Sequence, residues 1–156
     1  MDHKHYMQEA VTAALKGMQN NEGGPFGCVI VKDGKIIGKG NNKVTSTNDP
    51  TAHAEVTAIR DACKNLGSFQ LEGCTIYTSC EPCPMCLGAI YWARPEKVFY
   101  GSTKTDAAHI GFDDDFIYEE LKLPYADRSI PFEQLAPEVA IKPFREWAVK
   151  EDKTEY

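Results

Sequence analysis

Two short motifs constrain the fold most strongly, because their side chains must meet although they lie far apart in the sequence. The first is His53-Ala54-Glu55 and the second is Pro82-Cys83-Pro84-Met85-Cys86. One imidazole and two thiolates are three ligands for a tetrahedral zinc ion, and they leave the fourth position open for water. An open position is typical of catalytic zinc rather than structural zinc. The sequence therefore predicts a catalytic zinc site, one ion per protomer, held by His53, Cys83 and Cys86.

Glu55 follows His53 closely enough that both side chains can reach one pocket when the segment is helical. A carboxylate in that place can move protons to and from water on the metal, whose pKa zinc lowers towards neutrality. We therefore predict Glu55 to be the proton shuttle and not a zinc ligand.

Cys80 leaves a second interpretation open. It extends the run to Cys80-x-x-Cys83-x-x-Cys86, which with His53 would make a closed, four-ligand structural site. Pairs of the C-x-x-C type also occur in structural zinc sites and redox motifs. A structural site has no use for a glutamate beside the histidine, so the open, catalytic site is favoured.

Composition limits the class of partner. The length of 156 residues predicts a single domain over residues 1–156. A net charge of −6 argues against a nucleic-acid-binding surface, which needs clustered Lys and Arg, and favours a small substrate. The sequence has no long apolar run and no apolar stretch near its start. We therefore expect no membrane association and a cytoplasmic location.

Residue patterns predict helices alternating with strands, hence an α/β fold with the site at helix N-termini near one sheet edge. The partial positive charge of a helix N-terminus would favour thiolates at Cys83 and Cys86. The expected helices are 1–20, 50–66, 82–93, 105–108, 117–121 and 144–149. The first should bury a face made of Met7, Val11, Ala14, Leu15 and Met18, and the second a face made of Val56, Ile59, Cys63 and Leu66. The expected strands are 26–32, 35–40, 74–78, 98–100 and, as a last strand, 130–135.

Together the two motifs, H-x-E and P-C-x-x-C, are the signature of zinc-dependent base deaminases, and the chain resembles the cytidine-deaminase-like superfamily. The match extends over almost the whole chain, and the segments that carry it are 24–27, 41–42, 49–55, 78–86, 111–114 and 155–156. Within the superfamily, the chain looks most similar to the bacterial enzymes that act on guanine. The residues that carry this similarity are segment 111–114 and Tyr156.

This resemblance implies a three-layer α/β/α fold with a mixed, roughly five-stranded sheet. It also implies a homodimer in which C-terminal segments are exchanged, so that Tyr156 closes the partner's pocket. The implied reaction is hydrolysis of guanine to xanthine and ammonia. Asn42 and the backbone of Ala54 would hydrogen-bond the base, and aromatic side chains would surround its ring: Phe26, Trp92, Phe112 and Tyr156. Core packing is the alternative role for each aromatic residue.

Asp114 has a separate argument, which starts from the substrate. Guanine presents N1–H and its exocyclic amine as hydrogen-bond donors, so a guanine pocket needs an acceptor. We predict that Asp114 accepts these hydrogens and acts as a second catalytic carboxylate, whereas Asp113 and Asp115 are expected to cap the following helix.

Three other functions stay open. A deaminase of guanosine, other nucleosides or pyrimidine bases would use the same zinc and Glu55 in a different pocket. A tRNA adenosine deaminase would need a basic groove, which the net charge disfavours. A non-enzymatic zinc-binding module would turn over no base at all.

Overall fold

The computed structural model describes residues 2–156, which form two units divided after Asp115. The first unit is built on a sheet of four strands in the order β2-β1-β3-β4. Strand β1 runs antiparallel to β2 and β3, whereas β3 and β4 are parallel, so the sheet is mixed. The strands are β1 Gly27–Lys32, β2 Lys35–Asn41, β3 Thr75–Cys80 and β4 Lys97–Ser102.

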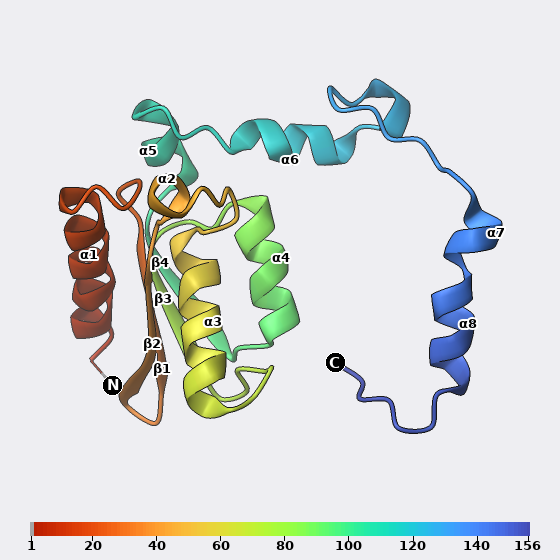
Figure 1. Cartoon of the computed structure of the whole chain (residues 1–156). Coiled ribbons are helices and arrows are strands. Elements are labelled where there is room, and N and C mark those ends of the chain that lie inside the picture. The colour runs from red at the N-terminus through yellow and green to blue at the C-terminus, as the bar shows by residue number, and fades with distance from the viewer. Residues whose placement is uncertain (1) are drawn as a thin grey trace. The chain divides into compact units, whose positions relative to one another are not determined.

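Helices cover both faces of this sheet. Helix α1, His3–Gln19, lies on one face, and α3, Ala54–Leu66, and α4, Pro84–Ala93, lie on the other (Figure 1). The predicted α/β/α arrangement of three layers is therefore confirmed.

The sheet has four strands where about five were expected, because residues 130–135 form no strand. Pro131 has no N–H to donate to a neighbouring strand, which weakens such a segment as a sheet element.

Shorter helices follow the sheet strands or connect them. They are α2 Val44–Thr47, α5 Lys104–His109, α6 Asp115–Lys122, the 3-10 turn Tyr125–Asp127, α7 Pro137–Ala140 and α8 Lys142–Val149. Helix α2 was not expected, and the helix predicted to start at residue 50 starts at Ala54. None of the helices in the described part of the chain combines the length and apolar character that crossing a bilayer requires.

The buried faces of α1 and α3 differ from the predicted ones. In α1, Leu15 and Met18 are 46% and 39% exposed, and the buried residues are Tyr6, Ala10, Ala14 and Gly17. In α3 the buried residues are Ala54, Glu55, Ala58 and Ala62, whereas the predicted Val56, Ile59, Cys63 and Leu66 are only partly buried.

Strand glycines explain this shift, because they let each helix backbone lie directly on the sheet. A Cβ atom on Gly27 would come 2.1 Å from the carbonyl oxygen of Ala10, and one on Gly40 would come 2.3 Å from that of Ala54. At such close approach only small side chains fit between helix and strand, so alanines occupy the buried face and larger residues lie beside it.

Candidate metal centre

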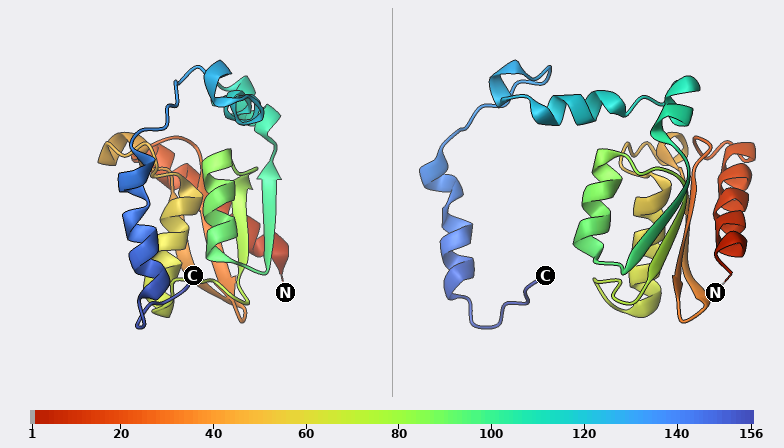
Figure 2. Two further views of the ribbon diagram at one scale, coloured as in Figure 1. Left: turned by 90° about the vertical axis from the view of Figure 1, so that its right-hand side faces the viewer. Right: turned by 180° about the vertical axis from the view of Figure 1, so that it is seen from behind.

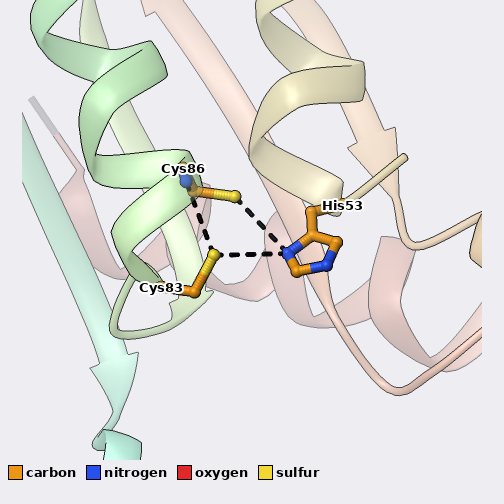
Figure 3. A group of neighbouring side chains, drawn as sticks. All are labelled: His53, Cys83 and Cys86. Carbon is orange, nitrogen blue, oxygen red and sulfur yellow. Dashed lines mark hydrogen bonds between the residues drawn. The ribbon is translucent and has the colours of Figure 1, made fainter. Parts of the chain in front are cut away.

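The three predicted zinc ligands come from the N-termini of two neighbouring helices. His53 is the N-cap of α3, immediately before its first residue, and Cys83 is the N-cap of α4. Cys86 lies in the first turn of α4. Figure 3 shows the imidazole and the two sulfur atoms facing one another. The sequence placed His53 inside a helix, but as an N-cap its backbone is extended, with φ −70° and ψ 159°.

The spacing of these atoms fits a tetrahedral zinc ion. Nδ1 of His53 lies 3.5 Å from Sγ of Cys83 and 3.6 Å from Sγ of Cys86. All three donor atoms lie within 4.8 Å of one another. With Zn–N of about 2.0 Å and Zn–S of about 2.3 Å, tetrahedral coordination separates nitrogen from sulfur by about 3.5 Å. The side chains are therefore already arranged for metal.

The charges of the cysteine pair also favour a cation. The Cys86 thiol and backbone N–H, together with His53, lower the pKa of Cys83 to about 4, and the N–H lies 3.4 Å from the sulfur. The pKa of Cys86 is raised, because its thiol donates to Cys83 and because it is buried. The first proton thus leaves the pair easily and the second does not, since two buried thiolates repel each other. A metal ion between them removes that repulsion.

Glu55 is buried in the first turn of α3 and is held by a neighbour that the sequence did not indicate. Burial raises the pKa of Glu55 above its usual value. The hydroxyl of Thr78, on β3, lies 3.0 Å from Oε1 of Glu55 and 3.1 Å from the carbonyl oxygen of Cys80. The available signal was a polar residue two positions after the apolar Ile76 in a strand, so that both side chains point to the same buried face.

Cys80 takes no part in the metal group. Its thiol donates to the carbonyl oxygen of Thr103 at 3.6 Å, and burial with the nearby charge of Glu55 raises its pKa to about 11. The donor atoms that lie within 4.8 Å of one another belong to His53, Cys83 and Cys86, and the Cys80 thiol is not among them. The geometry therefore supports the open, three-ligand site over the closed one.

Asn42 is buried, and its hydrogen bonds fix which way its amide points. Oδ1 accepts from the backbone N–H of Gly24 at 3.3 Å and of Val44 at 3.1 Å. The two N–H bonds of Nδ2 are therefore the groups that Asn42 can offer to a substrate acceptor. Ala54, the other predicted hydrogen-bonding residue, is the first residue of α3, where backbone N–H groups have no partner within the helix.

Phe26 and Phe112 meet although they are distant in the sequence. Their rings pack edge to face with centroids 4.9 Å apart. A Cβ atom on Gly24 would come 3.0 Å from the Phe112 ring and 3.2 Å from the Phe26 ring, so glycine leaves room for this contact. Phe26 also packs against the core, as its alternative role requires, whereas Phe112 is exposed.

Asp114 carries a buried oxygen atom, Oδ1, that has no partner among the described residues. Burial raises the pKa of its carboxyl group, and the charge of Cys83 raises it further. The charge of Asp114 in turn contributes to raising the pKa of His53. The structure therefore brings Asp114 near the metal ligands. Asp113 accepts from the backbone N–H of Asp115 at 3.1 Å, and Asp115 is itself the first residue of α6 instead of a residue that caps it.

One predicted site residue is not brought together with the metal ligands. Trp92 lies in the last turn of α4, at the opposite end from Cys83, and is 65% exposed. Tyr156 belongs to the second unit, Phe116–Tyr156, and its role stays a prediction.

Comparison with known proteins agrees with this centre. Residues 1–102 match the model of the cytidine and deoxycytidylate deaminase zinc-binding region. The chain is 58% identical to guanine deaminase of Bacillus subtilis over 156 residues, which is 100% of both chains. The X-ray structure of that enzyme superimposes with a TM-score of 0.97, covering 100% of this chain and 99% of the other. A tRNA-specific adenosine deaminase of Aquifex aeolicus is 41% identical over 102 residues, which is 65% of this chain and 67% of the relative. The chain belongs to the zinc-binding cytidine and deoxycytidylate deaminase family.

Proposed function

We propose that the chain catalyses the hydrolytic deamination of guanine to xanthine and ammonia. The full-length similarity to a guanine deaminase supports this substrate over tRNA adenosine, since the similarity to the tRNA enzyme covers 65% of the chain. The observation that carries the proposal is the unpaired, buried oxygen of Asp114 near the zinc ligands. A buried acceptor without a partner costs stability unless a ligand supplies a donor, and guanine supplies two.

The reacting carbon of guanine is C2, which lies between two ring nitrogens and carries the exocyclic amine, an amidine-like centre comparable to C6 of adenine. Zinc bound at His53, Cys83 and Cys86 supplies water activated at neutral pH. Glu55 takes one proton from that water as the water oxygen bonds to C2, and passes it to a ring nitrogen. It then takes the second proton from the new hydroxyl group and gives it to the amine, so that the C2–N bond breaks and ammonia and xanthine are released. Burial raises the pKa of Glu55 towards the working pH, which suits a group that must both accept and release a proton.

The remaining predicted residues recognise and orient the base in this proposal. Asp114 accepts from N1–H and the exocyclic amine, and Asn42 donates through Nδ2. The backbone N–H of Ala54 is a further donor. Phe26 and Phe112 enclose the ring. Tyr156 covers the ring, and Trp92, at the end of α4 far from Cys83, reaches it only from a partner subunit. Together these groups distinguish guanine by its two adjacent donors, which cytosine and adenine lack.

Product analysis tests the proposal. Purified protein is incubated with guanine, guanosine, cytosine or adenine, and ammonia and the deaminated base are measured. Guanine should be consumed fastest, with xanthine as product. Preference for guanosine or cytosine would show that the same zinc centre serves a different pocket, and a Glu55→Gln control, which should keep its zinc, identifies any background hydrolysis.

We also propose a homodimer that exchanges its C-terminal segments and works in the cytoplasm. Helices α6, α7 and α8 have no buried residues. Apolar side chains on them, such as Phe144 and Ile117, need a covering surface, which a second copy supplies. The six free thiols fit a reducing compartment.

A further inference from the structure

The turn that carries the zinc cysteines is bonded to the start of α5. Strands β3 and β4 run in parallel, with Cys80 opposite Ser102, and Figure 2 shows β4 leading directly into α5. The backbone N–H of Glu81 donates to the carbonyl oxygen of Ser102 at 2.8 Å. The Cys80 thiol donates to the carbonyl oxygen of Thr103. The two chain segments that leave the sheet here therefore hold each other in place.

The side chain of Glu81 adds a further connection, and this one depends on a carboxylate. Its Oε2 accepts from the backbone N–H of Lys104, the first residue of α5, at 3.0 Å. Hydrogen bonds to an ionised acceptor are stronger than neutral ones. Glu81 lies two residues before the zinc ligand Cys83 in the sequence, so one side chain links the metal turn to α5.

From α5 the connection to Asp114 is short. The ammonium group of Lys104 pairs with Oδ1 of Asp115 at 3.4 Å, next to Asp114 in the chain. The backbone N–H of Phe112 donates to the carbonyl oxygen of Ala107, within α5, at 3.0 Å. Any displacement of α5 therefore moves the loop that carries Phe112 and Asp114.

We propose that Glu81 is a positioning residue that sets the location of Asp114, through Lys104 and α5, relative to the zinc ligands. This inference rests on the proposed function, in which Asp114 contacts guanine. The reaction needs the base held by the loop of Phe112 and Asp114, while the N-termini of α3 and α4 present Glu55 and the metal. A misplacement of about 1 Å between such groups is enough to slow an enzyme by on the order of a hundredfold.

The first experiment compares Glu81→Ala with Glu81→Gln in the full chain, with the exposed Glu96→Ala as a matched control. Glu81→Ala should lower kcat/KM for guanine by roughly tenfold or more, mainly through KM, with one zinc per chain retained. Glu81→Gln should restore most of the activity, because its amide oxygen also accepts from the Lys104 N–H. Glu96→Ala should leave kinetics unchanged. Loss of zinc in Glu81→Ala, or no rescue by Glu81→Gln, would overturn the positioning role.

A double-mutant cycle separates this inference from the proposed function. In an Asp114→Ala background, Glu81→Ala should cause little further loss, because the residue through which it acts is gone. Fully additive losses would mean that Glu81 acts on the metal turn instead. If Asp114→Ala alone keeps full activity, the role of Asp114 is wrong and the inference falls with it. If Asp114→Ala is impaired and Glu81→Ala is not, only the role of Glu81 fails.

Discussion

Thr78 holds the carboxyl group of Glu55 through a hydrogen bond. Its single hydroxyl proton is within reach of both the Glu55 carboxylate and the Cys80 carbonyl oxygen. Thr78→Val keeps the shape but removes a hydrogen-bond donor to the buried Glu55 carboxyl group, so kcat should fall by roughly tenfold while zinc stays bound. Thr78→Ser, which keeps the hydroxyl, should retain most of the turnover. Wild-type kcat in Thr78→Val would show that the hydroxyl has no role in proton transfer.

Cys80 tests the number of zinc ligands. Because its thiol donates to Thr103 and is not among the donor atoms that face one another, Cys80→Ser should keep zinc and most of the activity. Cys83→Ser and Cys86→Ser are the matched comparisons and should lose metal and turnover together. Zinc content by elemental analysis decides this point, and a metal-free Cys80→Ser protein would restore the closed, four-ligand site.

Asp114 can be compared with its own neighbours. Asp114→Ala should reduce turnover on guanine by roughly tenfold or more, because the substrate donors lose their acceptor. Asp113→Ala and Asp115→Ala serve as controls in the same loop and should have smaller effects. Steady-state kinetics of the three variants decide whether this is a recognition loop, and equal small effects would make it a solvated turn.

The metal ligands could be predicted from the sequence, because spacing and residue type together identify them. One histidine and two spaced cysteines supply the ligands, and a glutamate beside the histidine indicates a catalytic site. The supporting residues could not. Thr78 and Glu81 act through contacts between segments that are remote in sequence, and nothing in the order of residues says that Glu81 lies beside Lys104.

Among the elements, α3 and α4 depend on the metal because their N-termini supply all three ligands. Zinc bound only to the folded protein stabilises it by mass action, by about 2.7 kcal/mol at a hundredfold excess over Kd. Removing zinc with a chelator should therefore lower Tm by on the order of 5–10 °C and abolish turnover, and added zinc should restore both. A Cys83→Ser variant should show no response to the chelator. An unchanged Tm in the parent protein would mean that the helix ends are held without metal.

The local sequence pattern predicted most helices and strands, but it did not predict which faces of the helices are buried. The hairpin of β1 and β2 has Asp33 and Gly34 at its turn, both with positive φ, as the aspartate-glycine pair indicates. Apolar periodicity misplaced the buried faces of α1 and α3, because Gly27 and Gly40 admit the helix backbones so closely that alanines, not leucines, fill the contact. That information resides in the strands, so a helix considered alone cannot supply it.

For the whole molecule, the main question is the oligomeric state, because many apolar side chains of α6 and α8 are exposed. They include Phe116, Ile117 and Leu121 of α6 and Phe144, Trp147 and Val149 of α8. Exposed apolar patches of this kind are typical of interaction surfaces, and the proposed dimer would cover them. Light scattering at working concentration should give the mass of a dimer, and a monomer with full activity would remove the partner whose tail the proposed function uses.

The tail itself supplies the last test. If Tyr156 closes a pocket, deleting residues 155–156 lets water into the site and weakens binding of the base, so KM for guanine should rise more than kcat falls. Tm should change little, because the terminal residues are exposed and contribute little to the core. Tyr156→Phe is the control, since it keeps the ring that covers the base and should stay close to the parent protein. A KM that the deletion leaves unchanged, in a protein that is still dimeric, would show that the C-terminus does not reach the active site.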